Sequence, residues 1–235
     1  MKLPLSNRLL ACCGFVHSND RVADIGCDHG YLGIHLLQSG IASSVIESDI
    51  NEKPLRCAME NAVKFGVMDR ISFCLSDGVR RLPRDFDCMV CAGMGADTMI
   101  SILEAAPWLQ SDRYRLILQC QSKRPELRKY LASKGFSISR ETLAQDGKFI
   151  YPVTEVCYAP GPAPGPAPAP WEYYISPQLI ADGSPLLLPF VRRVMGGVAG
   201  SLGGLRHSGR SDTEMAEIYT HLQELERRLT SDNGK

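Results

Sequence analysis

The sequence predicts a doubly wound α/β fold built on a mainly parallel sheet. Two observations predict it. Apolar runs of strand length alternate with amphipathic stretches of helix length from residue 21 onward, and glycine-rich or acidic turns close several of these runs. This alternation is typical of βαβ units, in which a helix connects two parallel strands. With 235 residues, the chain can form one sizeable domain and a smaller second one.

Seven strands and four helices are expected in the first two thirds of the chain. The expected strands cover residues 21–26, 44–50, 71–77, 87–93, 115–121, 136–144 and 149–159. The expected helices lie at about 30–38, 53–66, 97–106 and 124–134, with Asn51 and the pair Gln121–Ser122 as start signals. Because a turn at 145–148 separates the last two strands, they should form an edge hairpin. A parallel sheet that ends in such a hairpin is the layout of class I methyltransferases.

A proline-rich segment, APGPAPGPAPAP at 159–170, follows the last expected strand. Repeated proline removes backbone donors and favours an extended polyproline conformation. We expect a semi-stiff linker between a domain at 1–158 and a helical domain at 171–235. A ligand for a proline-recognising protein is the alternative function of this segment.

The C-terminal part predicts a helical, coiled-coil-like hairpin. From Met215 to Leu229, apolar residues recur at three- and four-residue steps, which predicts an amphipathic helix capped by Asp212. Its apolar stripe should pack against a helix around 186–198. Five glycines between 196 and 204 are expected to weaken that first helix or mark its end.

Composition excludes several classes of protein. The 26 basic residues balance the 26 acidic ones, so nucleic acid would have to be held by local patches such as 80–84 or 123–129. No apolar segment is long enough for a membrane span, and we expect a cytoplasmic protein. Most of the nine cysteines lie in apolar runs, among them Cys74, Cys88, Cys91 and Cys120, and are expected to be buried free thiols. The Cys88–Cys91 pair has no second pair nearby, so no metal is expected.

A glycine-rich turn follows the first expected strand and leads into a helix. It reads Asp24-Ile25-Gly26-Cys27-Asp28-His29-Gly30-Tyr31-Leu32. Glycines in such a turn let a ligand approach the backbone, and the helix start exposes N–H groups. A dinucleotide would bring a pyrophosphate here, and its fingerprint has glycine where this chain has Asp28. Asp24 and Asp28 instead suit S-adenosylmethionine, which carries a sulfonium and an ammonium and no phosphate.

Three further strand ends carry residues suited to this ligand. Asp49 can accept the ribose hydroxyls, with Glu47 as the second choice, two residues earlier. Asp77 can accept a hydrogen bond from the adenine amino group while Gly78 lets the loop turn, although an Asp-Gly pair at a strand end is often only a turn. Ala92, Gly93 and Met94 end the fourth strand with small residues that leave room for a flat acceptor, or form a packing turn.

Read in order, these residues resemble the bacterial TrmK family of tRNA (adenine(22)-N(1))-methyltransferases. Residues 5–9 resemble the family's opening Leu-Ser-x-Arg-Leu, and 22–32 resemble its Ala-Asp-Ile-Gly-x-Asp-His-x-Tyr-Leu. The segments at 77–78, 92–95, 116–119 and 127–128 also follow the family's order. The chain departs from the family pattern with Gly33 for proline, Ala96 for glycine, and Leu-Gln-Cys-Gln at 118–121 for Leu-Gln-Pro-Asn.

The resemblance implies a Rossmann-like catalytic domain, a C-terminal helical domain that helps to hold tRNA, and no metal. Since adenine N1 has a lone pair when unpaired, the enzyme must expose and align the base more than activate it. Asp28 and His29 are expected to line the methyl end and to steer the adenine amino group. Lys123 and Arg124 are expected to contact RNA, and Arg8 to contact RNA phosphate or lie over the cofactor cleft.

Three alternatives stay open from the sequence. One is a class I methyltransferase acting on a small molecule or a protein, which needs no basic surface and no C-terminal arm. Another is a module that binds S-adenosylmethionine without turnover, suggested by the altered segment at 119–121. The third is an NAD-dependent oxidoreductase, which Asp28 argues against.

Overall fold

The computed structural model describes residues 3–159, 161, 168–207 and 211–232. The chain forms two compact units, Met1–Gly161 and Pro162–Lys235. Most of the predicted linker at 159–170 lies outside the described residues.

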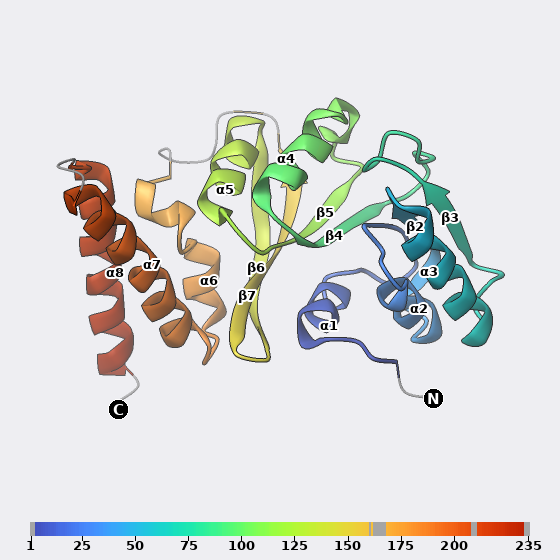
Figure 1. Ribbon diagram of the computed structural model, residues 1–235, viewed down its shortest axis with the longest axis horizontal. Coiled ribbons are helices and arrows are strands. Elements are labelled where there is room, and N and C mark those ends of the chain that lie inside the picture. The colour runs from blue at the N-terminus through green and yellow to red at the C-terminus, as the bar shows by residue number, and fades with distance from the viewer. Residues whose placement is uncertain (1–2, 160, 162–167, 208–210, 233–235) are drawn as a thin grey trace. The chain divides into compact units, whose positions relative to one another are not determined.

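A seven-stranded sheet forms the centre of the first unit (Figure 1). Its strands are β1 (Asp20–Ile25), β2 (Ala42–Asp49), β3 (Ile71–Leu75), β4 (Cys88–Met94), β5 (Arg115–Cys120), β6 (Phe136–Asp146) and β7 (Phe149–Tyr158). The spatial order is β3-β2-β1-β4-β5-β7-β6, and only β7 and its partners pair antiparallel. The seven predicted strands and the edge hairpin are confirmed. The order reverses between β1 and β4, and ligands bind at such a switch point in open α/β sheets.

Helices connect the strands and cover both faces of the sheet. They are α1 (Asn7–Cys13), α2 (Tyr31–Gln38), α3 (Glu52–Lys64), α4 (Ala96–Glu104) and α5 (Arg124–Ser133), with a 3₁₀ turn at η1 (Pro107–Leu109). The four predicted helices are confirmed as α2 to α5, whereas α1 was not predicted. The predicted start signal at Gln121–Ser122 is wrong, because Lys123 precedes α5 in a left-handed conformation with φ 53°.

Alternate residues of the central strands face opposite apolar layers. On β1, Val22 packs in the layer that includes α1 and α2, and Ala23 packs in the layer that includes α4 and α5. On β4, Cys88 and Cys91 separate in the same way, so these two thiols cannot bind one ion together. The prediction that Cys74 is buried is wrong, because this thiol is only half-buried.

The second unit is helical. It contains η2 (Pro170–Tyr173), α6 (Pro177–Asp182), α7 (Leu187–His207) and α8 (Thr213–Asp232). The predicted hairpin is confirmed, since α7 packs on α8. The Asp212 cap is also confirmed, because its carboxylate accepts from the backbone N–H of Met215 at 2.9 Å.

The predicted end of α7 among its glycines is wrong. The helix continues through all five of them to His207. Val191 and Val198 are buried on α7, as is Leu222 on α8. The free energy of this apolar packing offsets the poor helix propensity of glycine. None of the helices in the described ranges is long and apolar enough to cross a membrane.

Candidate functional site

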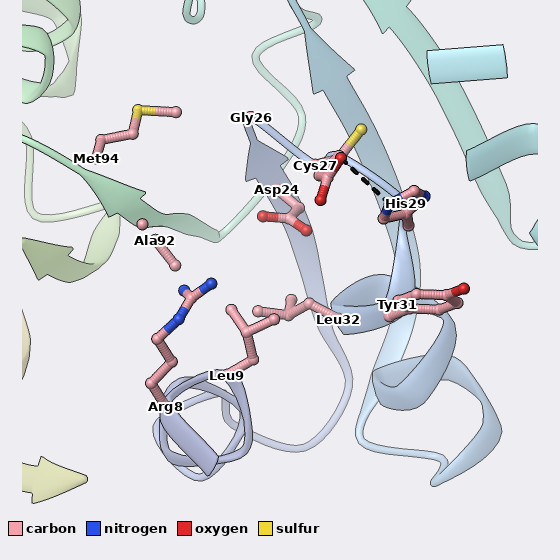
Figure 2. Close-up of a pocket in the computed structure, with 12 residues that line it drawn as sticks. Arg8, Leu9, Asp24, Gly26, Cys27, His29, Tyr31, Leu32, Ala92 and Met94 are labelled. Atoms are coloured by element: carbon pink, nitrogen blue, oxygen red, sulfur yellow. Dashed lines mark ion pairs between the residues drawn. The ribbon is translucent and has the colours of Figure 1, made fainter. Parts of the chain in front are cut away.

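A cavity of about 240 Å³ lies at the switch point, where β1 and β4 end (Figure 2). Its lining comes from α1, from the end of β1 and the turn after it, from the start of α2, and from the end of β4. The lining residues are Arg8, Leu9, Asp24, Gly26, Cys27, Asp28, His29, Tyr31, Leu32, Ala92, Gly93 and Met94. Segments that are distant in sequence therefore meet at the position where this sheet topology binds ligands.

The turn after β1 forms one wall of the cavity. Its backbone is left-handed at Gly26 (φ 75°), Asp28 (φ 52°) and Gly30 (φ 68°). The N–H of Gly26 donates to the carbonyl of Ser48 at 2.8 Å, which ties the turn to β2. A Cβ added at Gly26 would lie 2.3 Å from Cε of Met94. Glycine is required at position 26 both for the backbone conformation and for the close approach of β4.

Arg8 of α1 reaches the opposite wall. Its Nη1 donates to Oε1 of the buried Gln119 at 3.1 Å, and its Nε lies 3.5 Å from the carboxylate of Asp146. The same Gln119 oxygen accepts from the N–H of Gly93 at 3.0 Å. Figure 2 shows the Arg8 guanidinium and the Asp24 carboxylate pointing into the space between β1 and β4. The cavity thus has a positive and a negative group on facing walls.

Asp24 and Glu47 form a buried acidic pair beside the cavity. They are register partners on β1 and β2, so their side chains share a face of the sheet. Burial raises the pKa of Asp24 to about 7. Burial, followed by the charge of Asp24, raises the pKa of Glu47 well above its usual range. A Cβ added at Gly33 would lie 2.1 Å from Glu47 Oε1, so the glycine at this position makes room for the Glu47 carboxyl group.

His29 is held between two elements. Its Nδ1 lies 3.0 Å from Sγ of Cys57 on α3, and its Nε2 lies 3.6 Å from Oδ1 of Asp28, the pair marked by the dashed line in Figure 2. The ring stacks on Tyr31 with 5.5 Å between ring centroids. Asn61, one turn after Cys57, donates from Nδ2 to the His29 carbonyl at 2.9 Å. These contacts fix the position of a ring that lines the cavity.

Nine of the predicted cofactor residues line this one cavity. They are Asp24, Gly26, Asp28, His29, Tyr31, Leu32, Ala92, Gly93 and Met94. Gly30 is the N-terminal cap of α2 and does not itself line the cavity.

Asp49, Asp77 and Gly78 also lie outside the cavity wall, at the ends of the neighbouring parallel strands β2 and β3. Asp49 accepts from the backbone N–H of Asn51 at 2.9 Å. Asp77 lies 3.3 Å from Arg80, and Gly78 is left-handed, with φ 58°. Asp49 and Asp77 therefore lie at the edge of the sheet where the parallel strands end, as the cavity does.

Of the residues predicted to contact RNA, Arg8 lines the cavity, whereas Lys123 and Arg124 lie outside it at the start of α5. Lys123 Nζ pairs with Asp97 at 2.6 Å, and both side chains are exposed. Among the described residues there is no group of three or more His, Cys, Asp or Glu side chains that could hold a metal ion.

Sequence reasoning missed three residues of the site. Leu9 and Cys27 line the cavity and stand inside the two motifs at 5–9 and 22–32, which was the available signal. Gln119 accepts hydrogen bonds from Arg8 and Gly93, and although it ends the motif at 116–119, that motif does not indicate these partners.

Residues 5–154 match the family model described as a methyltransferase domain. The chain belongs to this methyltransferase family. The matched range contains all of the cavity's lining residues.

The chain is similar to curated proteins. It is 36% identical over 137 residues to a Mycoplasma genitalium protein provisionally named a tRNA methyltransferase, covering 56% of this chain and 59% of that protein. It is 31% identical over 149 residues to the tRNA (adenine(22)-N(1))-methyltransferase of Bacillus subtilis, covering 63% of each. The chain therefore spans about three fifths of the length of the curated relatives it matches.

The methyltransferase also shares its fold with a solved structure of TrmK from Mycoplasma capricolum in complex with S-adenosyl-homocysteine. The TM-score is 0.74 and the sequence identity 22%, covering 96% of this chain and 98% of that one. This similarity confirms the Rossmann-like methyltransferase fold that the motifs predicted.

Proposed function

We propose that this methyltransferase transfers a methyl group from S-adenosylmethionine to N1 of adenine 22 in tRNA. The observation that carries the proposal is the acidic, glycine-spaced cavity at the switch point of a methyltransferase sheet. The similarity to a B. subtilis enzyme named for this reaction supports the choice of substrate.

The charges of the cavity suit the amino-acid end of the methyl donor. Asp24 would bind the ammonium group, and Arg8 on the facing wall would bind the carboxylate. A pyrophosphate would meet the Asp24 and Asp28 carboxylates, which disfavours a dinucleotide. Arg8 would then lie over the cofactor cleft. This is one of the two roles expected for Arg8, and the other is contact with RNA phosphate.

The size of the cavity favours the same arrangement. Its volume of about 240 Å³ is below the roughly 300–1,000 Å³ of most small-molecule sites. It would therefore hold only part of the donor. The adenosine part would extend along the open edge, where Asp49 could accept from the ribose hydroxyls and Asp77 from the adenine amino group.

Methyl transfer requires that adenine N1 be aligned with the methyl group of the donor. When bound, S-adenosylmethionine supplies an electrophilic methyl group on a sulfonium. Gly93 carries no side chain, and a Cβ there would lie 3.3 Å from Arg8 Nη1, so glycine at the end of β4 lets the Arg8 guanidinium approach the backbone beside the cavity. His29 and Asp28 would steer the N6 amino group and keep adenine N1 in line with the methyl group.

The tRNA would lie over this sheet edge. Lys123 and Arg124 would contact its phosphates, and the helical second unit would supply further contacts. Since tRNA acts in the cytoplasm, we propose that compartment for the enzyme.

A methyl-transfer assay tests the proposal. Unmodified tRNA transcripts with adenine at position 22 are expected to gain one methyl group, mapped by mass spectrometry to N1 of that base. Transcripts with guanine 22 serve as the matched control and should gain none. Methylation of both transcripts, or of neither, contradicts the assignment of position 22. Methylation of a protein or metabolite pool in place of tRNA contradicts the assignment of the substrate class.

A further inference from the structure

Cys57 differs from the other eight cysteines in its surroundings. Six thiols are buried: Cys12, Cys13, Cys27, Cys88, Cys91 and Cys120. Three thiols are half-buried, namely Cys57, Cys74 and Cys157. Cys74 faces the carbonyl of Arg81 at 3.6 Å, and Cys157 faces the hydroxyl of Ser139 at 4.0 Å. Of these three half-buried thiols, Cys57 is the one in contact with a histidine.

The geometry around Cys57 is that of a thiol with a general base. Its Sγ lies 3.0 Å from His29 Nδ1, and the other ring nitrogen faces the Asp28 carboxylate at 3.6 Å. A neutral imidazole carries its proton on one nitrogen, so the tautomer with the proton on Nε2 leaves Nδ1 as an acceptor for the thiol proton. A thiol becomes nucleophilic as its thiolate, so a neighbouring base raises its reactivity.

The same histidine connects the thiol to the cavity. His29 lines the cavity wall, and Cys57 stands behind it on α3. The Asn61 amide holds the His29 backbone at 2.9 Å and lies 3.9 Å from the thiol, so the amide and the imidazole ring both border Sγ, while the half-buried Cys57 remains accessible to solvent. A group added to Sγ needs room that the imidazole ring now occupies. The ring would have to move, and the cavity wall would move with it.

We propose that Cys57 is a site of reversible modification by low-molecular-weight disulfides, and that the modification closes the cavity to its ligand. The thiolate attacks one sulfur of the disulfide while His29 takes the thiol proton. A protein–sulfur to small-thiol bond forms, the original S–S bond breaks, and the departing thiolate leaves as a thiol with the proton. The second half of the proposal rests on the proposed binding of the methyl donor.

Labelling rates test the thiol by themselves, in protein without any donor. With glutathione disulfide as the probe and peptide mass spectrometry as the readout, Cys57 is expected to react at least about tenfold faster than Cys74 or Cys157. His29→Ala should reduce the Cys57 rate to that of the two control thiols. Equal rates for the three thiols in the unmodified sequence, or a Cys57 rate unaffected by His29→Ala, would overturn the proposed reactivity.

Binding of S-adenosylhomocysteine by calorimetry tests the closing of the cavity. Protein modified at Cys57 is expected to bind it at least about tenfold more weakly, with full recovery after dithiothreitol. Cys57→Ser should bind like the parent protein before and after glutathione disulfide. Unchanged affinity after complete modification would overturn the control of the cavity. Absence of binding by the untreated protein would instead count against the proposed function, and the labelling rates would still decide the reactivity of the thiol.

Discussion

At the residue scale, the cavity depends on a few side chains whose neighbours come from other strands. Burial raises the pKa of Asp24, burial and the charge of Asp24 raise that of Glu47, and the glycine at position 33 leaves the space that Glu47 fills. Position 33 is also where the chain departs from the proline of the TrmK pattern. A side chain at position 33 would occupy the space of the Glu47 carboxyl group, so glycine at this position is what accommodates that group.

The acidic pair makes the stability of the fold depend on pH. Both groups have raised pKa values in the folded state, so the folded protein binds more protons than the unfolded chain. The contribution of this pair to stability is therefore fully present at low pH, below the unfolded values near 4, and is lost as the pH rises through the folded pKa of Asp24 at about 7. Glu47→Gln removes one ionising member. Its melting temperature should exceed the parent's by about 3 °C or more at pH 8.

The difference in melting temperature between Glu47→Gln and the parent should shrink at pH 5. At this pH both carboxyl groups of the parent and the Asp24 carboxyl group of the variant are largely protonated. The measurement is thermal unfolding followed by circular dichroism at the two pH values. An equal difference at both pH values would show that the substitution acts through packing and not through charge.

At the element scale, the glycines of α7 allow the effect of helix propensity to be measured without a change in packing. Nothing lies within 4 Å of a Cβ added at Gly197, Gly200 or Gly203, and all three have helical backbone. Replacement with alanine should stabilise the helical unit by about 0.5–1 kcal/mol per site, because alanine loses less backbone entropy on folding. Urea unfolding of the three single variants measures this gain.

Gly26→Ala is the matched control for these substitutions, since Gly26 has positive φ and its added Cβ would meet Met94. It should destabilise the first unit by more than about 1 kcal/mol. A loss of stability in the α7 variants would mean that these glycines serve a contact within the helical unit after all.

The elements divide into those that sequence predicts and those that tertiary contacts decide. The strands were predictable because β4 begins as a continuous apolar run and β1 and β5 are mostly apolar and buried along most of their length. The short helix α1 was not, because its seven residues carry no capping side chain and no acidic first turn. Its place depends on Gln119 and Asp146, more than one hundred residues away. For the same reason, motifs could predict the turn at 24–32 but not which wall Arg8 joins.

At the scale of the whole molecule, the cavity belongs to one of the two units of the chain. All residues that line the cavity lie within Met1–Gly161. A chain that ends after Gly161 should therefore bind S-adenosylhomocysteine within about threefold of the full-length affinity, while its affinity for tRNA falls at least about tenfold. Calorimetry and filter binding measure the two affinities. Equal tRNA affinity in the two chains would remove the second unit from substrate binding.

The position of α1 in the sequence has a consequence for how the protein is made. Arg8 is synthesised early, but Gln119 follows 111 positions later and the hairpin residue Asp146 later still. When β1 and β2 have been synthesised, the nascent chain still lacks Gln119 and Asp146, which position Arg8. The contacts that hold Arg8 in the cavity wall can form only after the hairpin has left the ribosome.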